Sequence, residues 1–170
     1  MLRQRRKQHE VSKADVSNKR RERIIRYAPL LIWIGVILFL SSGQGSMTQT
    51  SRFVGPLLRF LFPDITDPTL LIYHGYVRKF AHFAEYFGLG FLASRAFFYS
   101  SRSALRNYWY IFAFGIVLLI SSFDEINQSF NPARTGSGWD TLLDISGGAA
   151  AIFLFSMYVA RFKDRLALGS

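Results

Sequence analysis

The distribution of charge along the chain constrains its fold more than any other feature. Lys, Arg, Asp and Glu are crowded into the first 26 residues, into short patches between apolar stretches and into the last ten residues. A soluble helical domain instead spreads its charges along every helix at a period of 3.6 residues. Because a span needs roughly 20 mainly apolar residues, 170 residues have room for four. The pattern predicts an all-α, polytopic membrane bundle.

Four apolar stretches mark the expected transmembrane helices. They cover residues 27–40, 80–99, 108–123 and 141–160. Between the first two, prolines and arginines interrupt the apolar residues, so residues 53–62 are predicted to lie in the membrane interface rather than to cross the membrane. A short basic loop is expected at 100–107, and a second loop at 131–138 leads to the fourth span.

The distribution of Lys and Arg predicts the orientation, because cytoplasmic loops are enriched in both. A basic arm (1–26), the loop 100–107 and a basic tail (161–170) fall on one side of the membrane domain (27–160), so both termini are expected in the cytoplasm. Five cations fall on the other side and need a role, such as pairing with acids or with an anionic ligand: Arg52, Arg59, Arg78, Lys79 and Arg134.

The basic arm contributes to a net charge of +10. Such an arm can bind nucleic acid, but a basic segment beside a span also retains this end in the cytoplasm and is attracted to anionic lipid. We expect anionic lipid as the partner of the arm and no nucleic acid. The arm is far longer than the basic region of a signal peptide, so the first span is expected to be retained. The absence of cysteine excludes a disulfide framework and a thiol nucleophile.

Three segments place ionisable side chains near the outer ends of the second, third and fourth expected spans. Offsets of four and seven residues from Arg78 put His82 and Glu85 on one helix face. Ionisable groups inside a bilayer cost roughly 2.5–3.5 kcal/mol each on insertion scales, so they usually face the bundle interior. We therefore expect one pocket, open to the extracytoplasmic face, formed by Arg78, His82, Glu85, Asp124, Glu125, Gln128, Arg134, Asp140 and Asp144.

The same segments carry a series of motifs in a fixed order. They are Ser41-Ser42, then Arg78-Lys79-x-x-His82-Phe83-x-Glu85-Tyr86, then Asp124-Glu125-x-x-Gln128-x-Phe130, then Pro132-x-Arg134, then Asp140 and Asp144 with Gly147. Over about residues 30–160 this series resembles the VanZ-like family of bacterial integral membrane proteins. The resemblance implies a protein of the bacterial inner membrane and cell envelope. It also implies a relation to glycopeptide resistance, since the founding member is associated with low-level resistance to teicoplanin.

One hypothesis is an enzyme that acts on a phosphorylated or otherwise anionic lipid headgroup, such as a phospholipid or a cell-wall lipid intermediate. The substrate-binding residues are then Arg78, Lys79, Gln128, Arg134, Asp140 and Asp144. His82 serves as general acid or base, and Glu85 orients it. Asp124 or Glu125 activates water or attacks directly. In a metal-dependent variant, a divalent cation has as its ligands His82, Glu85, Asp124 and Glu125.

Three other readings fit the same residues. A non-catalytic binder or scaffold that alters the presentation of the envelope needs the arginines but no proton-transfer group. A small transporter fits less well, because the sequence shows no internal repeat. A purely structural network would hold the helices together, although such a network needs only one or two satisfied pairs and unpaired buried charge is costly.

Overall fold

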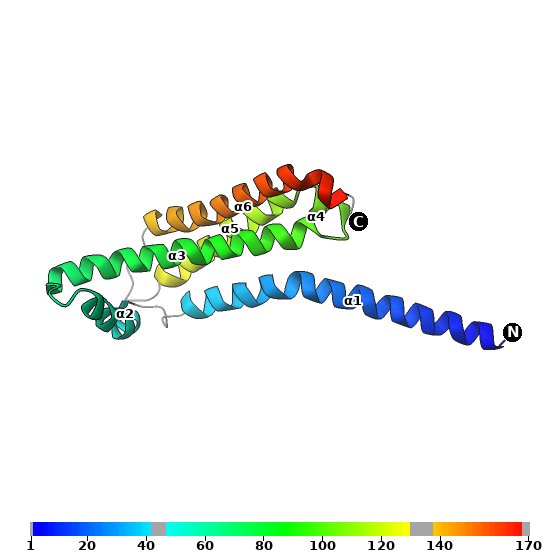
Figure 1. Cartoon of the computed structure of the whole chain (residues 1–170), viewed down its shortest axis with the longest axis horizontal. Helices are drawn as coiled ribbons and strands as arrows, with labels where there is room; N and C mark the ends of the chain where they lie inside the picture. The colour runs from blue at the N-terminus through cyan, green and yellow to red at the C-terminus, as the bar shows by residue number, and fades with distance from the viewer. Residues whose placement is uncertain (1, 42–46, 130–137, 168–170) are drawn as a thin grey trace.

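The computed structural model describes residues 2–41, 47–129 and 138–167, with side chains described for 15–41, 52, 54–127 and 139–162. The described residues contain no strand, which confirms the predicted all-α class. In chain order the helices are α1 (Leu2–Phe39), α2 (Met47–Leu61), α3 (Asp67–Phe98), α4 (Ser103–Asn107), α5 (Trp109–Ser129) and α6 (Gly138–Ala167). Helices α3, α5 and α6 form a bundle, α1 packs along α3, and α2 and α4 lie at opposite ends (Figure 1).

Two helices are long and apolar enough to cross a membrane, over Trp109–Asn127 in α5 and Trp139–Phe162 in α6. Only 28% of each stretch is buried inside the molecule, whereas the core helix of a soluble protein is mostly buried. Large apolar side chains such as Leu119 and Phe153 face outward instead. In the described residues, the first and second expected spans do not contain a stretch that is both long and apolar enough. The apolar part of α1 is short, and α3 carries several charged side chains.

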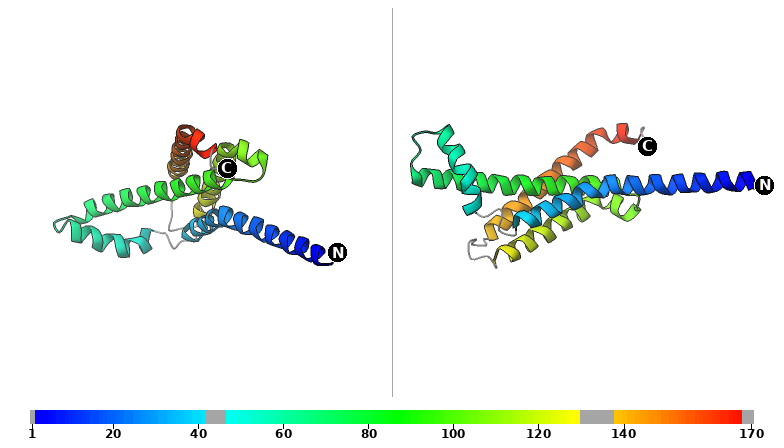
Figure 2. Two further views of the ribbon diagram at one scale, coloured as in Figure 1. Left: turned by 45° about the vertical axis from the view of Figure 1, so that its right-hand side comes forward. Right: turned by 90° about the horizontal axis from the view of Figure 1, so that it is seen from below.

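The helix bounds extend several of the predicted elements. The basic arm and the first expected span form the single helix α1, which continues past the bundle (Figure 2). Residues 47–61 form α2, which includes most of the segment 53–62 that was predicted to lie in the membrane interface. Helix α3 begins at Asp67, well before the expected start of the second span near Phe80. Pro68 is compatible with this start, because the first helical turn needs no N–H donor there.

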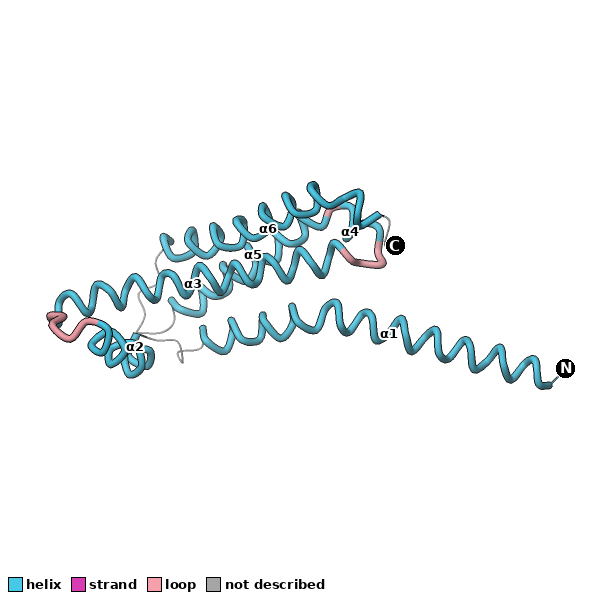
Figure 3. Tube along the Cα trace, in the orientation of Figure 1, coloured by secondary structure: helices cyan, strands magenta, loops and turns pink. Residues whose placement is uncertain are grey.

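The joining loops are short where the structure describes them, as the trace in Figure 3 shows. Helix α4 lies within the basic loop expected at 100–107, and α6 continues to Ala167 through the expected start of the tail. The predicted loop at 131–138 falls almost entirely outside the described residues. Arg59 of α2 forms an ion pair with Asp67 of α3, which gives one of the outer cations its partner.

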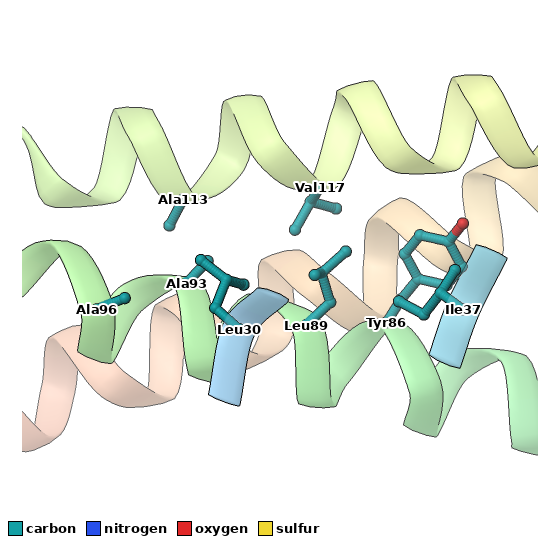
Figure 4. Packing of buried hydrophobic residues seen from close by; sticks show 8 residues of the cluster. All are labelled: Leu30, Ile37, Tyr86, Leu89, Ala93, Ala96, Ala113 and Val117. Carbon is teal, nitrogen blue, oxygen red and sulfur yellow. The ribbon is translucent and has the colours of Figure 1, made fainter. Parts of the chain in front are cut away.

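Each bundle helix turns one stripe of residues inward, at the spacing of three and four that keeps residues on one helix face. Figure 4 shows Tyr86, Leu89 and Ala93 of α3 meeting Ala113 and Val117 of α5. The buried stripes are Tyr86, Leu89, Ala93 and Ala96 in α3, then Ala113, Val117, Ser121 and Asp124 in α5, and Asp144, Gly148, Ala151 and Phe155 in α6.

Three glycines set how closely these helices approach. A Cβ atom on Gly90 would collide with the backbone of Gly148, and one on Gly147 would collide with the carbonyl oxygen of Phe83. A Cβ atom on Gly148 would also overlap Val117 of α5. The backbones of α3 and α6 are therefore nearly in contact, which small residues such as glycine allow.

Helix α1 is attached to the bundle by hydrogen bonds at three levels. Near α4, the hydroxyl groups of Tyr27 and Ser100 lie 2.8 Å apart. In the middle, Trp33 Nε1 donates to the backbone carbonyl of Glu85 at 2.9 Å. Towards α2, Asn127 of α5 donates through Nδ2 to Ser41 Oγ at 3.0 Å. These bonds run along the whole apolar part of α1, so this helix is a fourth member of the bundle.

Candidate functional site

The inward stripes end in ionisable side chains at the end of the bundle where α2 lies, here called the α2 end. His82 of α3, Asp124 of α5 and Asp144 of α6 meet there, with their candidate ligand atoms all within 4.8 Å of one another. Both aspartates are only 3% exposed. His82 Nδ1 lies 3.4 Å from Asp144 Oδ1. We call these three residues the His-Asp-Asp cluster.

The packing of the helices explains why the cluster forms. Asp144 precedes Gly147 by three residues, and Gly147 lies against the carbonyl of Phe83, the neighbour of His82 in the chain. Asp124 follows Val117 by seven residues, which places both on the same face of α5. Because Val117 contacts Gly148, that face is directed at α6. Close approach at the glycines therefore brings the three charged residues to one point.

Polar side chains of α3, α5 and α6 lie beside the cluster. The hydroxyl group of Tyr86 donates to Asp124 Oδ2 at 3.4 Å, a long hydrogen bond. Asp144 Oδ1 is buried, and its contact with His82 has the distance of an ion pair but not the geometry of a hydrogen bond. Nearby, Thr141 of α6 donates through its hydroxyl group to Glu125 Oε2 at 3.2 Å.

A cavity of about 180 Å³ opens beside the cluster. One part of its wall is polar, and the rest is apolar and comes from α1, α2 and α3. The polar lining residues are Ser41, His74, Arg78, His82, Glu85 and Asp124, and the apolar ones are Ile37, Leu40, Val54, Val77 and Ala81. The cavity therefore combines ionisable groups with a hydrocarbon-like wall.

His74 contributes a buried imidazole to this wall. It precedes the second expected span and is 2% exposed. Burial, and after it the positive charge of Arg78, lowers the pKa of His74 below its ordinary value. Arg78 lines the same cavity and carries a fixed positive charge.

The sequence model of the VanZ/LLP1 family matches residues 27–160. The chain belongs to this family. No curated protein and no solved structure matches the chain. The match begins in α1 just after the basic arm and ends within α6, so it includes every residue of the cavity and of the His-Asp-Asp cluster. Family membership and the two apolar helices identify a membrane protein, in a family associated in general with teicoplanin resistance.

The structure of this VanZ-like protein brings together part of the predicted site. Arg78, His82, Glu85 and Asp124 line the cavity, and Asp144 adjoins it through His82. Glu125 lies at the contact between α5 and α6. Asp140 is half-buried one helical turn before Asp144, and the side chain of Lys79 is exposed and does not line the cavity. Arg134 and the side chain of Gln128 lie outside the described part of the chain.

Three residues of the site in this VanZ-like protein were absent from the predicted set. His74 and Ser41 line the cavity, and Tyr86 donates to Asp124. The four-residue spacing that joins Arg78 to His82 continues to His74 on one side and to Tyr86 on the other, so this signal was present in the sequence. His74 was missed because the segment before Val77 was expected to lie outside the helix, whereas Tyr86 was expected inside the second span but not assigned to the site.

Proposed function

We propose that this VanZ-like protein binds a phosphorylated or otherwise anionic lipid headgroup in the cavity at the α2 end. One observation carries the proposal: a single cavity has Arg78 and other polar groups on one part of its wall and apolar side chains of α1, α2 and α3 on the rest. An amphiphilic ligand matches both parts. A soluble anion would use only the polar part.

The chemistry of the wall supports a phosphate-bearing ligand. A guanidinium group presents parallel N–H donors that match two phosphate oxygens, and such charge-assisted bonds are roughly twice as strong as neutral ones. Arg78 supplies this group inside the cavity. The glycerol or isoprenoid part of the lipid then contacts Ile37, Leu40 and Val54, where the removal of apolar surface from water or headgroup is favourable.

The residues beside Arg78 also suit hydrolysis or transfer of the headgroup. His82 can donate or accept a proton at the scissile bond, and Glu85 lines the same wall. Asp124 lines the cavity, whereas Glu125 does not line it and accepts a hydrogen bond from Thr141 at the contact between α5 and α6. We therefore assign water activation to Asp124 ahead of Glu125 in this reaction class.

A non-catalytic binder is the second candidate, and the ion-pair contact of His82 with Asp144 favours it, because a fixed histidine also serves a purely electrostatic role. The substitution His82→Gln separates the two. A binder in which His82 holds no cation should lose little, since Gln keeps the size and polarity of the side chain. An enzyme should lose about 100-fold or more of its rate.

The proposal includes a topology in which α1 and α3 cross the bacterial inner membrane beside α5 and α6. The hydrogen bonds along α1 support it, as do its large outward apolar residues Leu31 and Ile32, which are 65% and 66% exposed. The start of α1, α4 and the end of α6 lie at one end of the molecule (Figure 1), and all three carry basic residues. That end is cytoplasmic in this proposal, and the α2 end is extracytoplasmic.

An unbiased lipid comparison tests the binding proposal. Cells with the gene, without it and with Arg78→Gln are compared for every envelope lipid and lipid-linked intermediate. The control is Arg59→Gln, because Arg59 is exposed and pairs with Asp67 outside the cavity, where a salt bridge is worth about 0–1 kcal/mol. We expect Arg78→Gln to match the deletion and Arg59→Gln to match the parent. Identical lipid profiles in all four strains would refute the proposal.

Single cysteines test the topology in this cysteine-free chain. Substitutions at Ser17, Ser46, Ser103, Ser137 and Ser170 are treated in intact cells with a thiol reagent that does not cross the membrane. We expect labelling at 46 and 137 and protection at 17, 103 and 170. Labelling at 103 with protection at 46 and 137 would reverse the assignment of the α2 end.

A further inference from the structure

We infer that the His-Asp-Asp cluster binds a divalent cation of the Mn²⁺ type, which completes the headgroup site beside Arg78. The inference rests on the proposed function only for the headgroup that the cation would contact. The cation site itself is argued from the cluster alone. The sequence grouped His82 with Glu85, Asp124 and Glu125 as ligands. The structure instead assigns Asp144 to the set and leaves both glutamates outside it.

The geometry of the cluster is that of a partly closed metal site. One imidazole nitrogen and two carboxylate oxygens come from three different helices and lie within 4.8 Å of one another. An ion with bonds of roughly 2.0–2.2 Å holds neighbouring ligand atoms about 3 Å apart. Small side-chain rotations therefore close the three ligands around one ion.

The electrostatics of the cluster call for a positive charge. Asp124 and Asp144 are each 3% exposed, and taking a carboxylate out of water costs several kcal/mol unless it is compensated. The contact of Asp144 with His82 is 3.4 Å long and is not a hydrogen bond. A cation bound by both aspartates and by the imidazole compensates the two carboxylates, and His82 then acts as a ligand rather than as a general acid or base.

The donor set indicates the kind of ion. Carboxylate oxygens suit Mg²⁺, Ca²⁺ and Mn²⁺, whereas imidazole suits Zn²⁺ and other transition metals. One nitrogen with two carboxylates lies between these classes, and Mn²⁺ accepts both. Three protein ligands also leave coordination positions open on an ion of this kind, as catalytic sites do and closed structural sites do not.

The open positions of the ion would face the cavity. His82 and Asp124 both line the cavity, whereas Asp144 does not line it and lies 3.4 Å from His82 Nδ1. Arg78 lies on the same wall, four residues before His82 along α3. A phosphate in the cavity can then place one oxygen on the ion and others on the guanidinium group, which gives the headgroup two positive partners.

Direct Mn²⁺ titration of the purified full-length protein in detergent tests the inference without any lipid. Free Mn²⁺ is followed by its electron paramagnetic resonance signal, and Zn²⁺ and Mg²⁺ serve as competitors. We expect saturable binding at one site, weakened about 100-fold or more by Asp144→Asn and by His82→Gln. The control Asp67→Asn changes an exposed aspartate on α3 and should bind as the parent does.

A melting experiment covers the case in which a variant fails to fold. An ion that binds the folded protein raises its melting temperature, so Mn²⁺ should stabilise the parent and Asp67→Asn. Absence of both saturable binding and stabilisation in the parent overturns the inference, whatever the variants do. Equal binding by the parent, Asp144→Asn and His82→Gln also overturns it, since the ion then binds elsewhere.

The two proposals fail in different ways. If Mn²⁺ binds the parent and Asp144→Asn does not bind it, the cation site stands even when the lipid profiles of all strains are identical. If Arg78→Gln changes the lipid profile and no Mn²⁺ binds, the headgroup site stands without a cation.

Discussion

The two ends of the bundle differ in the side chains that the helices turn inward: aromatic rings at one end and ionisable groups at the other. At the α4 end the stripes of α3 and α6 run into an aromatic cluster, in which Phe98, Trp109 and Phe155 meet edge to face with ring centroids 5.2–6.0 Å apart. At the α2 end the inward faces of α3, α5 and α6 instead carry His82, Asp124 and Asp144.

The difference indicates that one end of the bundle supplies packing energy and that the other end holds the candidate site. Aromatic pairs gain about 0.5–1.5 kcal/mol beyond the area that they bury, and the glycine contacts between the two ends let the backbones meet. The α2 end gains less, because its polar contacts are long and its cavity leaves space between helices. We infer that the aromatic cluster and the glycine contacts between α3 and α6 supply stability. This stability allows costly buried charges to persist at the α2 end.

The largest expected effect is a loss of folded protein in Gly90→Ala. The added methyl group would overlap the backbone of Gly148, which cannot rotate away, so α3 and α6 must separate. We expect this variant to accumulate poorly in the membrane and to melt well below the parent in detergent. The matched control is Gly115→Ala, where a Cβ meets nothing within 4 Å. If both variants melt like the parent, the close crossing is not what holds the bundle.

A second prediction tests the aromatic cluster at the α4 end. Trp109 is 8% exposed and contacts both Phe98 and Phe155. Truncation by Trp109→Ala should lower the free energy of unfolding by about 3–5 kcal/mol, because a cavity replaces the indole ring. Leu119→Ala, on the outward face of α5 at 67% exposure, should cost much less. Equal losses measured by denaturant unfolding in detergent would show that this end is no better packed than the lipid-facing surface.

A third prediction compares the two ends through single hydrogen bonds to α1. Tyr27→Phe removes the bond to Ser100 at the α4 end, and Asn127→Ala removes the bond to Ser41 at the α2 end. Interhelical bonds of this kind in membrane proteins are worth about 0.6 kcal/mol on average. We expect each variant to lower the melting temperature slightly and by a similar amount. A much larger loss for Asn127→Ala would mean that α1 is held mainly at the site.

The sequence predicted which residues share a helix face more securely than which faces meet. Arg78, His82 and Glu85 were expected on one face of one helix, and all three line the cavity. Lys79 was expected to bind with Arg78, but adjacent residues on a helix point about 100° apart, and its side chain is exposed.

The grouping of Asp144 with His82 could not be read from spacing. It depends on the approach of α6 to Phe83 at Gly147, a contact between residues far apart in the chain. The early start of α3 was also missed, because Pro63 and Pro68 suggested a break throughout the segment. Pro68 instead occupies the first turn of the helix, where proline is tolerated.

The smallest expected effect on stability comes from the site itself, in Glu85→Gln and Asp124→Asn. In a structural network, removal of one partner leaves a buried charge uncompensated and destabilises by about 3–5 kcal/mol. In a functional site the clustered charges are a strain, so their removal leaves the melting temperature close to that of the parent. We expect both variants, and Arg134→Gln, to be made in normal amounts and to lose the lipid phenotype. If they instead fail to accumulate, and a double substitution of Glu85 and Arg78 by Gln restores both amount and phenotype, the charges hold helices together and the contrast between the two ends disappears.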